Sequence, residues 1–211
     1  MADYATLAAL KDRVQISAST YDATLESLIT AASRKIDRLC RRPDGFVALT
    51  TATARYYAGS GGPIQWIDEC TNITTVSVKE AITDTTYTDW TTSDWAAGRG
   101  DSANPDLNHT PYEFLTVTPW GDYSYFPSGR FSGATVTTVK VTAKWGYATA
   151  VPYDIAEATL MQAVRWWKRL QSGMSDTLAS GELGMMLYQM QLDPDIAGIL
   201  RDGRYVRHTV G

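Results

Sequence analysis

Hydrophobic and polar residues alternate with a period of two between residues 139 and 147, which is the pattern of a half-buried β-strand. After Pro152 the period changes to that of a helix. The apolar residues then fall on one narrow stripe at 100° per residue, and the charged residues fall opposite it. The stripe consists of Ala156, Leu160, Ala163, Val164, Trp167 and Leu170. The pattern therefore predicts a strand, a turn and an amphipathic helix over residues 152–171.

Two more helices are predicted at the N-terminus. A short first helix ends near Gln15, and its apolar residues at helical spacing are Leu7, Leu10 and Val14. Ser19 followed three residues later by Asp22 resembles a capping box, which predicts that a longer second helix begins there. Pro43 ends this second helix.

The back of the second helix carries a cluster of cations, namely Arg34, Lys35, Arg38, Arg41 and Arg42. Such a basic face can contact DNA phosphate or an acidic partner surface. Alternatively, the cations complement the helix dipole in its last turns and are otherwise solvated. We favour the solvated face, and both interpretations stay open.

Residues 46–150 have the character of a β-rich insertion. Short strands are expected at Thr51–Ala58, Pro63–Asp68, Ile73–Glu80 and Glu113–Thr118. The rest of residues 81–134 forms a long connection, which is typical of a functional or mobile segment. Its aromatic residues either form a platform that stacks on sugars or anchor the segment onto the sheet and line a subunit interface, which we favour. They are Trp90, Trp95, Tyr112, Trp120, Tyr123, Tyr125 and Phe126.

The C-terminal region contains a methionine-rich segment and then a short helix. The methionines suit an adaptable contact surface or a local core; they are Met174, Met185, Met186 and Met190. Asp193 and Pro194 predict the start of the helix. Beyond it the tail is basic and has few apolar residues to offset an ordering entropy of roughly 1–2 kcal/mol per residue. We therefore expect residues from about Asp202 to Gly211 to be mobile in the isolated protein.

Composition narrows the possible functions. The chain of 211 residues has 19 Lys and Arg against 23 Asp and Glu, a net charge of −4 that argues against binding nucleic acid over a broad surface. Cys40 and Cys70 do not form a disulfide framework. No stretch approaches the ~20 apolar residues of a membrane span, and no secretion signal is recognisable. We therefore expect a protein that folds in a cytoplasm and does not enter a membrane.

Catalytic and ligand-binding patterns are absent from the sequence. Neither His109 nor His208 has a Cys or a carboxylate at metal-ligand spacing. The Gly-rich turn at 59–62 lacks the Lys-Ser/Thr that follows a nucleotide-binding loop. We therefore predict that the protein is not an enzyme and has no catalytic residues, metal site or cofactor.

Three segments resemble the head–tail connector proteins of long-tailed double-stranded DNA bacteriophages, also called adaptor or head completion proteins. They are the two opening helices (1–45), the strand–GYA-x-x-VP–helix unit (136–171) and the LDPD helix with its basic tail (190–207). Together they cover about half the chain. The resemblance implies an α+β fold in which a small helical bundle carries the β-rich insertion. The bundle consists of the two N-terminal helices, the 152–171 helix and the short C-terminal helix.

The resemblance implies a single connector domain over residues 1–211 with four parts. These are the N-terminal helices (1–45), the β-rich insertion (46–150), a helical segment (151–190) and a C-terminal helix with a docking tail (191–211).

A connector of this family is a structural adaptor. Its copies, typically twelve, form a ring under the portal protein at the DNA-packaging vertex, and head-closure or tail proteins dock beneath it. DNA passes through the ring without specific binding. The resemblance thus places the protein at the head–tail interface of a virion, and in the host cytoplasm during assembly. The alternative is a glycan-binding or receptor-recognition module that uses the aromatic residues of 81–134.

Two sets of contact residues are candidates under this interpretation. The tail can dock to the portal, because Tyr and Arg often carry interface energy; its candidates are Arg201, Arg204, Tyr205 and Arg207. A second set extends the apolar stripe of the 152–171 helix sideways, interrupts its charged face or belongs to the methionine-rich segment. These candidate subunit-interface residues are Ile155, Met161, Trp166, Met185 and Met186. We expect the free protein to be a monomer or a weak oligomer that forms rings only on a portal.

Overall fold

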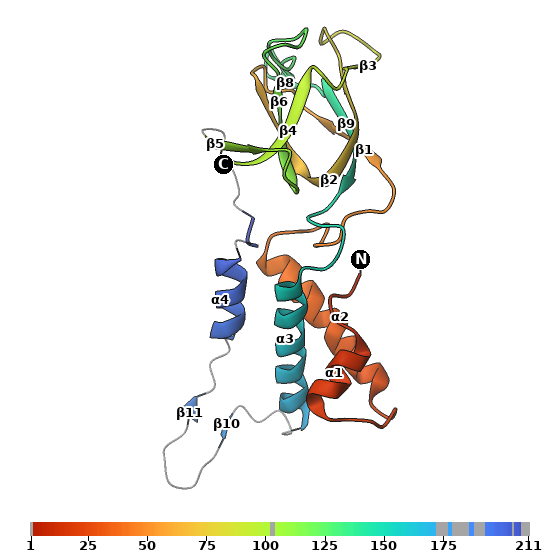
Figure 1. The fold of residues 1–211 in the computed structure, drawn as a ribbon, viewed down its shortest axis with the longest axis vertical. Coiled ribbons are helices and arrows are strands. Elements are labelled where there is room, and N and C mark those ends of the chain that lie inside the picture. Colours follow the sequence, from red (N-terminus) through yellow and green to blue (C-terminus); the bar gives the residue numbers. More distant parts are fainter. Residues whose placement is uncertain are drawn as a thin grey trace. The chain divides into compact units, whose positions relative to one another are not determined.

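The computed structural model describes residues 2–101, 104–171, 177–178, 186–187, 193–203 and 205–207. Over these residues the fold is α+β, as predicted, with helices and a mostly antiparallel sheet (Figure 1). The chain divides into two compact units. The helical unit consists of Met1–Pro43 and Val151–Gly211, and the β unit consists of Asp44–Ala150.

The helical unit is built around one long helix, α3, which packs against the other three helices of its described part. Figure 1 shows α4 and α2 beside α3. The helices are α1 (Leu7–Val14), α2 (Asp22–Leu39), α3 (Tyr153–Gln171) and α4 (Pro194–Asp202). Between α1, α2 and α3 lies an apolar core formed by Leu10, Leu25, Ile29, Ala32, Leu160, Ala163 and Trp167.

The start of α4 is capped as the sequence predicts, whereas the start of α2 is not. Asp193 caps α4 as predicted, because its side chain accepts a hydrogen bond from the backbone N–H of Asp195 at 3.0 Å. The predicted capping box of α2 is wrong. Tyr21 occupies the N-cap position without a side-chain hydrogen bond, and Asp22 instead pairs with Lys11 of α1 at 2.6 Å. An ion pair to a neighbouring helix has replaced the local cap.

The buried face of α3 is wider than the predicted stripe. Leu160, Ala163 and Trp167 are buried as predicted, whereas Leu170 is 43% exposed. The additional buried residues of α3 are Ile155, Ala158, Thr159 and Gln162. The wider face follows from the presence of α4, because α3 packs against helices on several sides.

The β unit contains a seven-stranded sheet in the order β1-β9-β2-β6-β4-β5, with β3 paired to β2. Every pairing between these strands is antiparallel. The strands are β1 (Thr53–Tyr57), β2 (Ile64–Val78), β3 (Thr88–Asp89), β4 (Trp95–Asp101), β5 (Asn104–Leu107), β6 (Tyr112–Val117) and β9 (Val139–Trp145). The alternation predicted for 139–147 is confirmed, since Val139, Val141, Ala143 and Trp145 of β9 are buried. Short ribbons are formed by β7 (Arg130–Phe131) with β8 (Ala134–Thr135), and by β10 (Thr177–Leu178) with β11 (Met186–Leu187), the latter in the helical unit.

Two predictions about the strands are wrong. Pro63–Asp68 and Ile73–Glu80 were expected as separate strands, but β2 is continuous and accommodates the polar residues between them by shifts of register against β9. In addition, β4 and β5 lie within the segment expected to be a long connection. β4 contains Gly98 and Gly100, residues that weaken a strand prediction, and its pairing with β6 supplies order that its own composition does not.

The two ends of the inserted β unit are held together. Val47 and Ala148 form an isolated bridge, and the N–H of Ala48 donates to the carbonyl of Ala148 at 2.8 Å. Gly146 lies beside this bridge with φ of +138°, and a Cβ there would stand 2.4 Å from the Cα of Ala48. A glycine is therefore required at this position.

Candidate functional site

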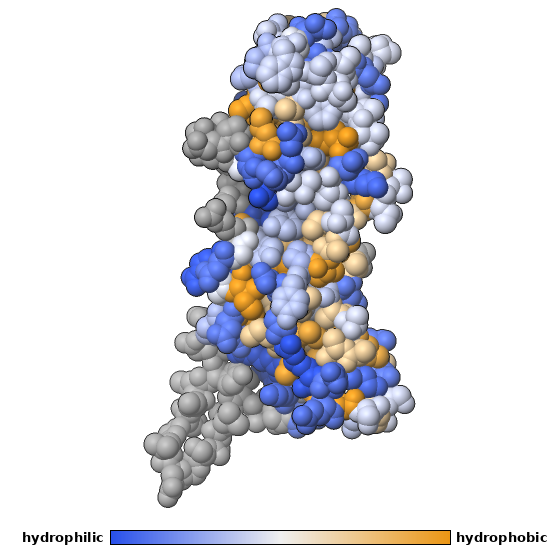
Figure 2. Space-filling view, viewed as in Figure 1, coloured by the Kyte–Doolittle hydropathy of each residue, from blue (hydrophilic) through white to orange (hydrophobic). Residues whose placement is uncertain are grey.

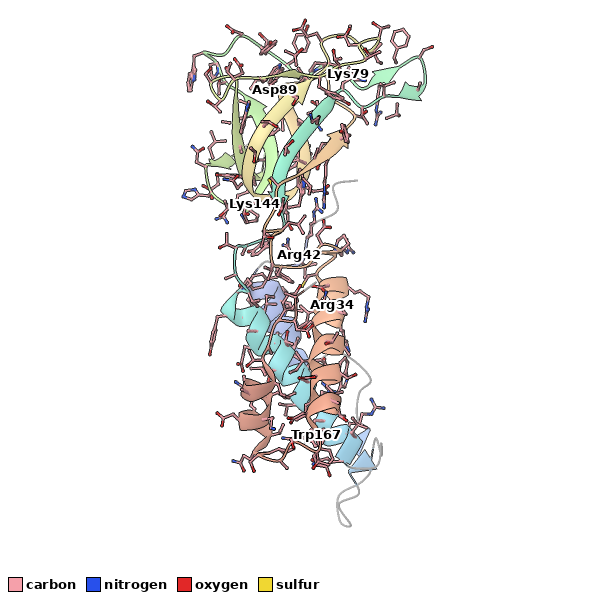
Figure 3. The ribbon with its side chains drawn as sticks, turned by 90° about the vertical axis from the view of Figure 1, so that its right-hand side faces the viewer. Arg34, Arg42, Lys79, Asp89, Lys144 and Trp167 are labelled. Atoms are coloured by element: carbon pink, nitrogen blue, oxygen red, sulfur yellow. The ribbon has the colours of Figure 1, made fainter. Side chains whose placement is uncertain are left out.

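Two of the five residues predicted as a basic face, Arg34 and Arg42, bind partners within the chain. Arg34 pairs with Asp37 at 3.2 Å and donates to the carbonyl of Ala2 at 2.6 Å. Arg42, just beyond the end of α2 in Figure 3, is only 4% exposed. The interpretation of these two cations as a solvated or DNA-binding face is therefore wrong, because intrachain partners occupy them. Arg38 and Arg41 are exposed, as such a face requires.

The half-buried Lys35 connects α2 to α3. Its ammonium nitrogen lies 5.4 Å from the centroid of the Trp166 ring, within cation–π range. Burial, together with the nearby charges of Arg165 and Arg38, lowers the pKa of Lys35. We call Lys35, Arg38, Arg165 and Trp166 the basic–aromatic face. The sequence alone did not predict that these residues are neighbours, because α2 and α3 are more than 100 residues apart along the chain.

The candidate subunit-interface residues have different environments. Ile155 is fully buried within its own chain, so its assignment to a surface seam is wrong: the packing of α3 encloses it. Trp166 and Met161 are half-buried and are accessible to a second protein. Met185 and the side chain of Met186 lie outside the described part of the chain.

The segment after α4 contacts its own chain. The Arg42 side chain donates to the carbonyl of Tyr205 at 2.9 Å, and the N–H of Arg207 donates to the carbonyl of Cys40 at 3.0 Å. The Tyr205 hydroxyl donates to Asp154 at 3.1 Å. These hydrogen bonds argue against the expected mobility of the tail for Tyr205–Arg207, which stays a prediction. Hydrogen bonds to α3 and to the residues just after α2, which the low apolar content did not reveal, hold this segment.

The other docking candidates are placed differently. Arg201 has a side chain that is 80% exposed, with Asp202 at 3.8 Å. Arg204 lies outside the described residues. The described residues therefore do not define a single docking surface. Arg201 is exposed on α4.

A shallow groove of about 640 Å³ runs between α4 and the start of α3. Its lining residues are Asp154, Pro194, Asp195, Gly198, Ile199, Asp202 and Gly203. The groove is acidic because three carboxylates border it, and its floor includes the apolar Ile199. Figure 2 shows hydrophobic side chains among hydrophilic ones over α3 and α4 on this side of the helical unit. The sequence indicated the helix but not the groove, which needs both helices.

The aromatic residues of 81–134 are divided between interior and surface. Trp90 is 5% exposed and stacks on Tyr123 and Phe126, with ring centroids 4.3 and 5.0 Å away. These three rings anchor the segment within the β unit, and the buried Trp90 and Phe126 are not available to stack on a sugar, whereas Tyr123 is half-buried. Trp120 and Tyr125 are 79% and 62% exposed and remain on the surface. The division favours the anchoring interpretation over a continuous glycan platform.

The described residues show little reactive chemistry. Among them no group of three or more His, Cys, Asp or Glu side chains is arranged to hold a metal ion. Burial raises the pKa of the Cys40 thiol to about 11 and that of Cys70 to about 12, which disfavours the reactive thiolate. No helix in the described part of the chain is long and apolar enough to cross a membrane.

Comparison with known proteins gives a likeness to solved structures. No protein-family model matches the sequence, and no curated protein matches it either. Among solved structures, the chain is similar to a chain of "Neck of empty GTA particle computed with C6 symmetry", where GTA denotes a phage-like gene transfer agent. The TM-score is 0.50 at 16% sequence identity, over 97% of this chain and 91% of that chain. The likeness shows that this chain shares its fold with a chain from the neck of a phage-like particle.

Proposed function

We propose that this protein is a non-enzymatic structural adaptor of a phage-type neck. Its copies form a ring under the portal protein, join the head to the tail and let DNA pass through the middle. The observation that carries the proposal is the shared fold over 97% of this chain with a chain from the neck of a phage-like particle. The residues that resemble the connector family lie at both ends and at the junction after the β unit, and they point to the same class independently.

A ring is the expected arrangement of the copies. The similar neck was computed with sixfold symmetry, and a ring of twelve copies is compatible with it because twelve is a multiple of six. The charge of the chain suits the passage of DNA. The β unit has six Lys and Arg against eleven Asp and Glu, so it repels phosphate and lets a duplex slide. Head-closure or tail proteins would bind the other end of the ring, and the virion neck would be the final location.

The proposal is tested by mixing the purified protein with the portal protein of the same phage and imaging the mixture by negative-stain microscopy. We expect an additional ring on the portal, whereas the protein alone forms no stable ring and associates only weakly, at high concentration. Portals that stay bare at tens of micromolar protein would contradict the adaptor function.

The same assay tests the docking tail. We propose that Arg201, Arg204, Tyr205 and Arg207 contact the portal, through a complementary acidic surface. Truncation after Leu200 should abolish portal binding, but it also removes the intrachain bonds of Tyr205 and Arg207. Arg201→Glu is the sharper variant, because its exposed side chain can change without loss of packing. Unchanged binding by Arg201→Glu and by the truncated protein would exclude the tail as the anchor.

A further inference from the structure

The basic–aromatic face is a crowded cluster of positive charge. Burial is the main cause that lowers the pKa of Lys35, and the charges of Arg165 and Arg38 lower it further, so the cations repel one another in the isolated chain. Arg165 is held by Asp193 at 3.3 Å, whereas Arg38 is exposed. Trp166 adds a half-buried aromatic ring, a residue type enriched at the centres of protein interfaces. An acidic protein surface that covered this face would relieve the repulsion.

The groove between α3 and α4 has the complementary chemistry. Asp195 and Asp202 on its border are exposed, and Ile199 is half-buried within it. Apart from the neighbouring backbone of α4, no atom of the described residues lies within 4 Å of the position that a Cβ on Gly198 would take. A side chain from another molecule can therefore reach the surface of α4 at this point without displacing anything.

The face and the groove cannot meet within one chain. Asp154 and Trp166 are twelve residues apart on α3, which places them about 120° apart around the helix axis. Arg165 is the exception, because it lies only about 20° from Asp154 around the axis and reaches Asp193 beside the groove. Lys35 and Arg38 belong to α2, whereas the groove belongs to α4 and the start of α3, so these two cations and Trp166 look in a different direction from the groove. A second copy can nevertheless present its face to the groove of the first, and its own groove then remains open for a third. Such head-to-tail contacts generate closed rings when the rotation between copies closes.

We propose that the basic–aromatic face of one copy docks into the α3–α4 groove of the next copy. The inference rests on the proposed ring function and names the surfaces that build the ring. Lys35 and Arg38 face the aspartates of the groove, and Trp166 packs on Ile199 and Gly198.

A second copy fits the face better than a nucleic acid does. Binding along a DNA backbone uses several phosphate contacts made by a broad basic surface. Here Arg165 already has an acidic neighbour and Arg34 and Arg42 are engaged within the chain, so few cations remain for phosphates. By contrast, an acidic, partly apolar surface that matches the face is present on the same molecule.

Charge reversal tests this interface. The first variant, Lys35→Glu with Arg38→Glu, makes the face acidic; the second, Asp195→Lys with Asp202→Lys, makes the groove basic. Each variant alone opposes like charges at every contact, and we expect its self-association constant to fall at least about tenfold. An equimolar mixture restores association, because reversed face then meets reversed groove and native face meets native groove. Sedimentation velocity over a concentration series measures the association of each variant and of their mixture.

Lys144→Glu is the matched control, since it reverses an exposed charge in the β unit and should leave association unchanged (Figure 3). Recovery in the mixture also shows that both variants are folded. Association of either variant at the wild-type level, failure of the mixture to recover, or a wild-type protein that stays monomeric at millimolar concentration would each overturn the interface. So would a DNA duplex that binds through Lys35 and Arg38 while self-association is unaffected. If the variants fail to associate yet wild-type protein never binds the portal, the interface stands and the adaptor function falls.

Discussion

Trp90 and Trp120 belong to the same aromatic-rich segment, but their environments give them different roles. Trp90 is enclosed by Tyr123 and Phe126, whereas Trp120 is 79% exposed. Trp90→Ala removes a buried ring and leaves a cavity, so we expect the free energy of unfolding to fall by about 3–5 kcal/mol. Trp120→Ala serves as the matched control and should change it by no more than about 0.5 kcal/mol. Urea unfolding followed by circular dichroism measures both. Similar losses from the two substitutions would show that Trp120 is also structural.

Gly146 is required by its backbone angle and by its close neighbour. Its φ of +138° is strained for an L-residue, and a Cβ would collide with Ala48. Gly146→Ala should therefore destabilise the protein by about 2 kcal/mol or more. Gly62→Ala is the control, because no atom of the described residues beyond its chain neighbours lies within 4 Å of the new Cβ, and it should be close to neutral. Thermal unfolding of the two variants makes the comparison, and equal melting temperatures would contradict it.

At the scale of elements, α1 and α3 are joined by an ion pair. Arg13 donates to both carboxylate oxygens of Glu157, at 2.6 and 2.7 Å, and this lowers the pKa of Glu157. A lowered carboxyl pKa gives stability that is present above the unfolded-state value of about 4.5 and is lost as pH falls through the folded value. Both side chains are partly exposed, so Glu157→Gln should cost about 0.2–1 kcal/mol at pH 7.

The pH dependence distinguishes this pair from simple packing. The difference in unfolding free energy between wild type and Glu157→Gln should shrink as pH falls below about 4.5, and it should also be small in an Arg13→Gln background. Denaturant unfolding at pH 7 and at pH 3.5 supplies the test. A difference that is the same at both pH values would mean that the charge of Glu157 contributes nothing.

Elements whose evidence is local were predictable from the sequence. The alternation of β9, the amphipathic pattern of α3 and the Asp193 cap of α4 each lie within a few neighbouring residues. β4 was missed because its pairing with β6 stabilises a glycine-containing segment. The predicted capping box of α2 was wrong because Asp22 pairs with Lys11 of α1. Longer-range sites were equally hidden: Lys35 with Trp166, and Tyr205 with Arg42, become neighbours only when the helices pack.

At the scale of the whole molecule, the chain is a helical unit with a β unit inserted into it. Each unit has its own apolar core. One lies between α1, α2 and α3, and the other is centred on residues such as Val76, Leu115, Phe126, Val141 and Trp145. The insertion also begins and ends at adjacent points, since Val47 bridges to Ala148. These features are those of a domain that can be inserted without interrupting the fold of its host.

We therefore predict that the two units fold separately. A chain of residues 44–150 should give a cooperative unfolding transition, because it keeps its sheet, its core and the bridge that closes its ends. A second protein, with Pro43 joined to Val151 through about six Gly and Ser residues, keeps α1–α4 and should be strongly helical, since such a linker spans roughly 13 Å. Circular dichroism and two-dimensional NMR of each protein measure the outcome. If residues 44–150 give no dispersed spectrum, the β unit depends on the helices for its stability. If only the linked helical protein is unfolded, the helical unit depends on the β unit.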